Sequence, residues 1–294
     1  MLKHRLVACL TLKERIIVQS IGFEKYLPIG RPEITIEFLN NWGIDEIVVL
    51  DIDATRESRL VDIELVQRIS KKCFVPLTVG GGITTVEEMK ELIRQGADKI
   101  CINTSAIQNP PLIREASHVL GSQCVVVSLD VKKNGRGEYE IFTHSGKKAT
   151  GINPRDFAQK AEALGAGEIF ITSITRDGSK QGYDLELIKE ISRAVSIPVV
   201  ACGGVGNPSH FVEAIRESTV SAVAAGNYFH FTEHSPMITK AFISKCPDAK
   251  IRFDTYADYR HFSFMNEKMT HRIDKKEDQY LKDTRFKYHP KEVI

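Results

Sequence analysis

Short apolar segments alternate with segments of helical periodicity along most of the chain. Eight apolar segments are present, at residues 6–10, 46–51, 75–79, 99–102, 124–129, 168–172, 197–202 and 220–225. Their apolar residues are consecutive rather than alternating, which is typical of parallel strands covered on both faces. Between them, the spacing of apolar residues predicts helices at residues 33–42, 86–94, 154–164, 185–194 and 209–216.

This alternation predicts an α/β fold, a single closed (β/α)8 TIM barrel, because such a barrel is built from eight strand–helix units. The alternative, an open doubly wound sheet, would have about six strands and a phosphate-binding motif after the first. The sequence has neither feature. The chain also repeats, because PLTVGGGI at 76–83 resembles PVVACGGV at 198–205, which lies 122 residues later. The repeat predicts two half-barrels related by a twofold axis.

Three segments lie outside this pattern. Residues 12–30 predict a long first loop, and residues 131–150 predict a hairpin with Asn134-Gly135 at its turn. We expect the barrel to occupy residues 1–250 and a C-terminal extension to occupy residues 251–294. The extension contains 18 charged and 8 aromatic residues among 44. Two interpretations stay open, a segment that packs on the barrel or on a partner, and a loose terminus.

Composition narrows the classes of partner. The 40 lysines and arginines nearly balance the 38 aspartates and glutamates, and a net charge of +2 argues against nucleic acid as the main partner. The six cysteines form no CxxC pair, which argues against zinc and fits a reducing cytoplasm. No apolar run is long enough to span a membrane. We therefore expect a cytoplasmic protein without a metal or a cofactor.

Glycines and small polar residues follow several strands at the end where barrel enzymes place their sites. Glycine lets backbone N–H groups approach an anion closely. One predicted phosphate site lies where the ends of the third and fourth strands meet. A second lies at the symmetry-related ends of the seventh and eighth strands. We therefore expect a small ligand with a phosphate at each end. The residues of the two sites are Gly81, Gly82, Asn103 and Thr104, and Gly203, Gly204, Ala225 and Gly226.

Asp130 follows the fifth strand and is the strongest candidate for a general acid or base. With a gap of three residues relative to the offset of 122, the repeat places its counterpart at or near Thr11, where a hydroxyl is a poor base. Asp51, Thr172 and Asp177 also follow strands and are candidate ligand contacts. Each carboxylate has an alternative role as a structural cap of a loop or helix.

Long ordered motifs add a family resemblance over about residues 1–250. They are VLDIDAT (49–55), PLTVGGGI (76–83), GADKICINTSA (96–106), GSQCVVVSLDVK (121–132), GAGEIFITSITRDGSKQGYDLEL (165–187), GGVG (203–206) and AAGNYFHF (224–231). The chain resembles the HisA/HisF family, in particular the cyclase subunits of imidazole glycerol phosphate synthase. The resemblance implies a barrel that takes ammonia from a glutaminase (HisH-like) docked on its N-terminal face. It also implies an ammonia gate made by Arg5, Glu46, Lys99 and Glu168. The alternative is that these charges form a paired structural plug.

Two positions depart from the pattern that the resemblance implies. The family uses aspartates after strands 1 and 5, and the first corresponds to Thr11 while the second corresponds to Asp130. A family lysine in the first loop corresponds to Gln19. These departures resemble a branch that works with an amidotransferase-type sugar enzyme in surface-polysaccharide synthesis. Three hypotheses follow: an ammonia-handling subunit for sugar amidation, an active cyclase of histidine biosynthesis, and a non-catalytic scaffold for the glutaminase.

Overall fold

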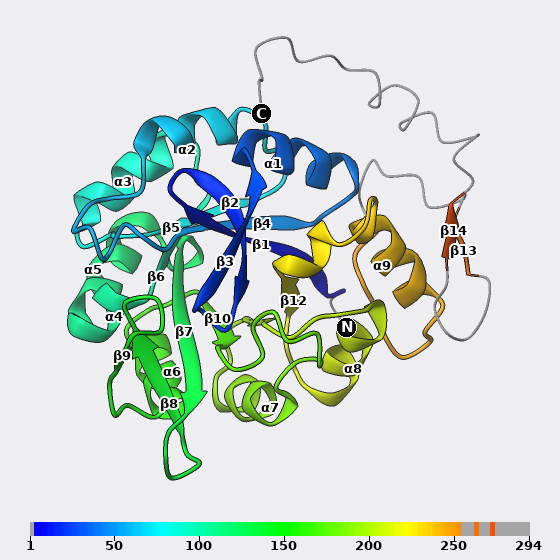
Figure 1. Ribbon diagram of the computed structural model, residues 1–294. Helices are drawn as coiled ribbons and strands as arrows, with labels where there is room; N and C mark the ends of the chain where they lie inside the picture. Colours follow the sequence, from blue (N-terminus) through cyan, green and yellow to red (C-terminus); the bar gives the residue numbers. More distant parts are fainter. Residues whose placement is uncertain (1–2, 254–261, 265–270, 274–294) are drawn as a thin grey trace.

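A computed structural model describes residues 3–253, 262–264 and 271–273 and confirms the predicted barrel (Figure 1). Parallel pairing runs around a ring of eight strands, and β12 pairs with β1 to close it. The strands, in order around the ring, are β1 (Arg5–Lys13), β4 (Glu46–Asp51), β5 (Leu77–Gly80), β6 (Lys99–Ile102), β7 (Val125–Lys133), β10 (Glu168–Ser173), β11 (Val199–Cys202) and β12 (Ala222–Ala225).

Helices surround the barrel, and the five predicted ones are all present (Figure 1). α3 begins with a capping box, in which Thr85 and Glu88 satisfy each other's backbone N–H groups. The pattern did not predict α2, α4, α5 or α9. The helices are α1 (Pro32–Asn41), α2 (Ile63–Ser70), α3 (Val86–Arg94), α4 (Thr104–Gln108), α5 (Pro111–Leu120), α6 (Pro154–Ala163), α7 (Leu185–Ala194), α8 (Pro208–Glu217) and α9 (Ser235–Ser244), with 3-10 turns η1 (Ser122–Cys124) and η2 (Asn227–His230).

The first and fifth barrel strands each continue into a hairpin. β7 pairs with β8 (Tyr139–Thr143), which pairs with β9 (Lys148–Ala149), so the predicted hairpin is confirmed. The predicted loop over residues 12–30 is wrong, because β1 pairs with β2 (Ile16–Ile21) and β2 with β3 (Lys25–Gly30). The β1–β2 turn is made by Glu14 and Arg15, both with positive φ, where Asn-Gly would be the usual signal.

The half-barrel repeat is visible in the strand register. Thr11 pairs with Leu50, and Asp130 pairs with Thr172. Leu50 and Thr172 are 122 residues apart, which is the offset of the sequence repeat, so Thr11 and Asp130 occupy equivalent positions in the two halves. Both residues lie inside long strands rather than after them.

Two apolar layers hold the barrel together. The outer layer lies between strands and helices, and a smaller cluster that includes Val7, Val48, Phe170 and Val200 fills the inside of the barrel. Ile251 is buried and forms a bridge with His4 at the start of β1. β13 (Phe262–Phe264) pairs with β14 (His271–Ile273). The expected packing of residues 251–294 otherwise lies outside the described residues.

Candidate active site

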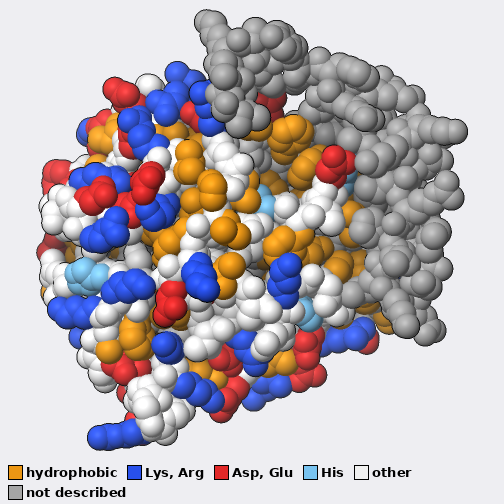
Figure 2. Space-filling model, in the orientation of Figure 1, with side chains coloured by type: hydrophobic (Ala, Val, Ile, Leu, Met, Phe, Trp, Pro, Cys, Tyr) orange, Lys and Arg blue, Asp and Glu red, His pale blue; other side chains and the backbone are white. Residues whose placement is uncertain are grey.

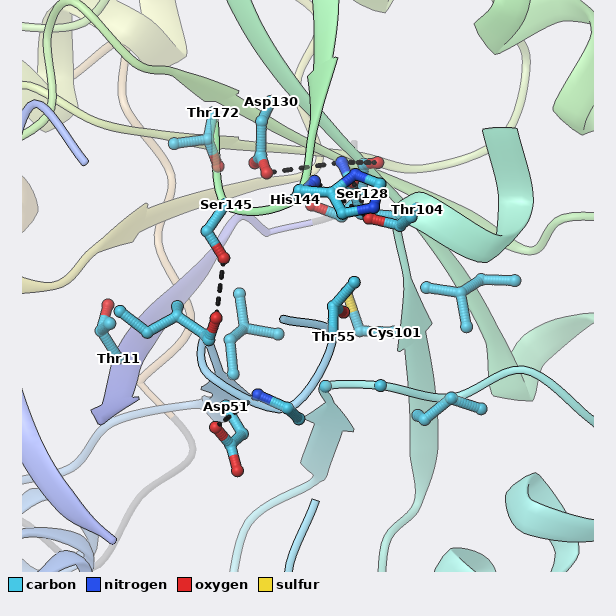
Figure 3. A pocket seen from close by; sticks show the side chains of 18 of the residues that line it. Thr11, Asp51, Thr55, Cys101, Thr104, Ser128, Asp130, His144, Ser145 and Thr172 are labelled. Atoms are coloured by element: carbon cyan, nitrogen blue, oxygen red, sulfur yellow. Dashed lines mark hydrogen bonds between the residues drawn. The ribbon is translucent and has the colours of Figure 1, made fainter. Parts of the chain in front are cut away.

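A cavity of about 450 Å³ opens at the carboxyl ends of the barrel strands. Figure 3 shows Asp130 and Thr172 together on one side, with Thr11 and Asp51 elsewhere on the wall. Such a volume suits a small-molecule ligand. Ten of the thirteen catalytic and ligand-binding residues proposed from the sequence line it: Thr11, Asp51, Gly81, Gly82, Asn103, Thr104, Asp130, Thr172, Asp177 and Gly226.

Asp130 is a half-buried carboxylate in the cavity wall. The Asn103 amide donates to its Oδ2 at 3.4 Å. Burial, with a smaller contribution from the charge of Asp177, raises the pKa of Asp130 to about 7. A carboxyl group with that pKa can both accept and return a proton near neutral pH, which suits a general acid or base.

Asp177 is a second carboxylate at the cavity and lies beneath the β2–β3 hairpin. The Ser20 hydroxyl donates to its Oδ2 at 2.6 Å, and the Phe23 N–H donates at 3.4 Å. Burial raises the pKa of Asp177 to about 6, although these hydrogen bonds oppose the rise. Asn227 also holds Ser20, because its Oδ1 accepts from the Ser20 N–H at 3.0 Å. The hairpin is therefore fastened over the cavity from two strand ends.

Asp51 is occupied by contacts within the protein. Arg59 Nη1 lies 2.6 Å from its Oδ2, and the N–H groups of Asp53 and Ala54 donate to its Oδ1 at 3.1 and 3.2 Å. These contacts fold the β4–α2 loop against the cavity. They favour the structural role for this carboxylate over a direct contact with ligand.

The first glycine cluster is required by close backbone packing. Gly81 and Gly82 have φ of +131° and +67°. A Cβ at Gly82 would lie 1.8 Å from the carbonyl oxygen of Arg59, and one at Gly81 would lie 2.7 Å from that of Asp51. The glycines thus bring the β5–α3 turn against the β4–α2 loop, next to Asn103 and Thr104 on the same wall. This backbone arrangement suits an anion.

The second glycine cluster is placed differently. Gly203, Gly204 and Ala225 do not line this cavity, whereas Gly226 and Asn227 do. Gly204 is covered by the β10–α7 loop, since the Gly182 N–H donates to its carbonyl at 2.8 Å. Ala225 belongs to the outer apolar layer. The structure therefore joins only one edge of the second predicted phosphate site to the cavity.

The floor of the barrel is a closed ring of four charges, each on the first residue of its strand. Arg5 contacts Glu46 at 2.5 Å and also contacts Glu168. Lys99 Nζ lies 2.8 Å from Glu46 and 2.9 Å from Glu168. Each cation therefore bridges both anions, which compensates much of the cost of burying the two glutamates.

Between this ring and the cavity, the barrel interior carries uncharged side chains. Cys9, Cys101 and Cys202 are free thiols that line the cavity and belong to the inner apolar cluster. A hydrogen bond with Cys202 and burial raise the pKa of Cys9, and burial raises that of Cys101. Both thiols are therefore neutral at physiological pH.

Comparison with known proteins identifies the family. A sequence model of the family described as "Histidine biosynthesis protein" matches residues 5–235. The chain belongs to this family. The match confirms the resemblance to HisA/HisF barrels that the motifs indicate.

The chain covers nearly the whole length of its curated relatives in the family. The "Imidazole glycerol phosphate synthase subunit HisF" of Pyrococcus furiosus is 45% identical over 245 residues, which are 83% of this chain and 97% of the relative. The "Putative imidazole glycerol phosphate synthase subunit hisF2" of Vibrio vulnificus is 43% identical over 262 residues, which are 89% of this chain and 96% of the relative.

Several residues that line the cavity of this histidine biosynthesis family member were not predicted from the sequence. Ser20, Phe23 and Tyr26 come from the hairpin read as a loop, and His144 and Ser145 come from the β8–β9 turn. The Ser145 hydroxyl donates to the Ile52 carbonyl at 2.9 Å across the cavity (Figure 3). No sequence signal marks these residues, because they reach the cavity only through the folding of the two hairpins.

Among the residues that the structure describes, no three His, Cys, Asp or Glu side chains are arranged to hold a metal ion. No helix in the same residues is long and apolar enough to cross a membrane.

Proposed function

We propose that the chain is the barrel subunit of a HisF-type glutamine amidotransferase complex. It receives ammonia from a glutaminase on its N-terminal face and supports nitrogen transfer to a phosphorylated or sugar-type substrate in surface-polysaccharide synthesis. The observation that carries this proposal is the hydroxyl of Thr11, which holds the register position equivalent to Asp130 in a barrel that keeps the cavity and the charged ring. A missing acid/base group costs about 10²–10⁴ in rate.

The ring and the interior support an ammonia path. Neutral ammonia crosses an uncharged interior far more readily than the ammonium ion, since burying an unpaired charge is costly. The ring lies at the strand starts and the cavity at the strand ends, so a path between them runs along the barrel axis. Ammonia entering there has to pass Arg5 or Lys99, whose side chains close the ring.

The second candidate function is the cyclase reaction of imidazole glycerol phosphate synthase. It is favoured by Asp130, whose pKa of about 7 suits acid/base work, and by Asp177 near it at the same cavity. In that case Asp130 and Asp177, which both belong to the second half-barrel, carry out the acid/base chemistry that one carboxylate in each half would otherwise share.

The test is a direct assay with the phosphorylated ribulosyl aminoimidazole substrate and ammonium salt. We expect slow turnover by the wild type and a gain of about 10²–10⁴ for Thr11→Asp, which restores a carboxylate opposite Asp130. Thr11→Val is the matched control, because it changes the same side chain without adding a base. Wild-type turnover at the rate of an authentic cyclase would reject the amidation role and leave the second candidate.

The path is tested in the complex with the glutaminase and the sugar amidotransferase. Ala222 lies inside the barrel, so Ala222→Phe narrows the interior. We expect glutamine-driven product formation to be lost while product formation from ammonium salt persists in the same variant. Persistent glutamine-driven synthesis would refute the path. If Asp130→Asn changes neither reaction, the chain acts as a scaffold for the glutaminase without chemistry of its own.

A further inference from the structure

Large apolar side chains are exposed only near the two ends of the barrel, among the residues that the structure describes. Three of them lie on the β2–β3 hairpin at the cavity mouth: Ile21, Leu27 and Ile29, which are 39%, 51% and 39% exposed. Phe74, which is 79% exposed, precedes β5, and Val119 lies near the end of α5, so both are at the opposite rim. Apart from Val119, the surrounding helices carry no such side chain within the described part of the chain.

The two faces of the β2–β3 hairpin have different surroundings. Ser20 and Tyr26 pair directly, and both line the cavity, so their face points inward. Neighbouring residues in a strand point to opposite faces. Ile21 and Leu27 therefore point away from the cavity, and Gln19, which pairs with Leu27, points outward with them. Ile29 lies at a β-bulge opposite Ile17 and Val18, is exposed and does not line the cavity. A two-stranded hairpin at a protein surface ordinarily has polar residues on its outer face.

The hairpin that carries the outer face is held in place by hydrogen bonds and by close contacts with neighbouring loops. Asn227 and Asp177 hold the hairpin through Ser20, as described above. Two glycines of neighbouring loops lie against it, because a Cβ at Gly146 would come 2.9 Å from Phe23 and one at Gly178 would come 2.7 Å from the Ser20 carbonyl. Docking on such a pre-ordered surface costs little conformational entropy.

The loops that hold the hairpin carry mainly positive charges, while Glu24 lies at the tip of the hairpin itself. The loops at 144–148 and 175–180, which hold the hairpin, carry four cations: Lys147, Lys148, Arg176 and Lys180. Their one carboxylate is Asp177, which is turned inward to Ser20. Figure 2 shows hydrophobic side chains over the hairpin on this face, with lysines and arginines beside them. The complementary surface is apolar with a rim of carboxylates.

We propose that the outer face of the β2–β3 hairpin, formed by Ile21, Leu27 and Ile29, is the docking site for the enzyme that consumes the ammonia. That enzyme presents an apolar groove with an acidic rim. The inference rests on the proposed function, since it gives the ammonia leaving the barrel a closed route into a second protein. The hairpin's inner face lines the cavity, so a partner seated on its outer face covers the mouth without displacing the ligand walls.

A membrane is a poorer occupant of this face. Glu24 lies at the exposed tip of the same hairpin, where it would meet the negative headgroups of an anionic bilayer. Three apolar side chains on a flat ribbon also bury less area than a membrane-binding amphipathic helix.

The test is the affinity between the purified full-length chain and a purified amidotransferase-type sugar enzyme from the same organism. Leu27→Asp and Ile29→Asp each place a charge in the centre of the face. We expect each to weaken binding by at least about 30-fold, as for a hot-spot residue. Phe74→Asp is the matched control, an equal change at the opposite rim, and it leaves this affinity unchanged. Circular dichroism and thermal unfolding show that each variant is folded.

Several outcomes would overturn the inference. They are unchanged affinity in both hairpin variants, equal loss in Phe74→Asp, and a wild-type dimer in sedimentation velocity that Leu27→Asp dissociates. Binding of the wild type, but not Leu27→Asp, to vesicles of anionic phospholipid would assign the face to a membrane instead. If glutamine-driven transfer works in the wild type while the hairpin variants bind normally, only this inference fails. If the wild type transfers no ammonia, the proposed function fails.

Discussion

Replacing Asp130 with asparagine is expected to stabilise the protein while removing its candidate acid/base. Burial raises the pKa of Asp130 from an ordinary 3.8 to about 7. Because the folded-state pKa is above the unfolded-state pKa, the wild type loses stability as pH rises from about 4 to about 7. The full difference corresponds to roughly 4 kcal/mol at pH 8.

The expected gain is smaller than this upper value, because Asp130 faces a cavity that admits water and is only half-buried. We expect Asp130→Asn to raise the free energy of unfolding by about 1–2 kcal/mol at pH 8 and by less than about 1 kcal/mol at pH 5. The asparagine keeps an oxygen that accepts from Asn103, so the local packing is preserved. Active sites commonly trade stability for function in this way.

The assay is urea-induced unfolding at pH 5 and pH 8, followed by circular dichroism. Glu24→Gln is the control, because it neutralises an exposed carboxylate at the hairpin tip and is expected to change stability little at either pH. An Asp130→Asn effect that is equal at the two pH values would refute the reasoning. A loss of stability at pH 8 would do so as well, since it would mean that the charged form is the favoured one.

Further predictions concern the ring, the glycine turn and a buried ion pair. Lys99→Met leaves two buried glutamates with one cation, so urea unfolding should show a loss of about 3 kcal/mol, and an unchanged midpoint would contradict this. Gly82→Ala should cost at least about 2 kcal/mol more than Gly22→Ala in thermal unfolding, because both have φ above +60° but only Gly82 meets a carbonyl. Lys240→Met removes the cation that lies 2.6 Å from the buried carboxylate of Asp45. The Tm measured by calorimetry should fall by several degrees, and equal Tm values would argue against the pair.

The barrel could be predicted from sequence because its signals are local. Each inner strand is a short run of apolar residues, and each predicted helix has its own amphipathic spacing, so the order of elements specifies the architecture. The hairpin at 131–150 was also predictable, since Asn134-Gly135 marks its turn. The hairpin at 12–30 was not, because Glu14 and Arg15 occupy positive φ values that neither residue type signals.

The candidate site was likewise predictable from the sequence in part. The sequence alone determined that Asp130 and Thr11 are counterparts and that a carboxylate is absent from one half, because both facts follow from the repeat and the residue types. Only the tertiary structure decided that Asp51 is taken up by Arg59, that Gly203 lies away from the cavity, and that one hairpin face is apolar and exposed. These outcomes depend on contacts between residues distant in the chain, and no local pattern of apolar and polar positions encodes such contacts.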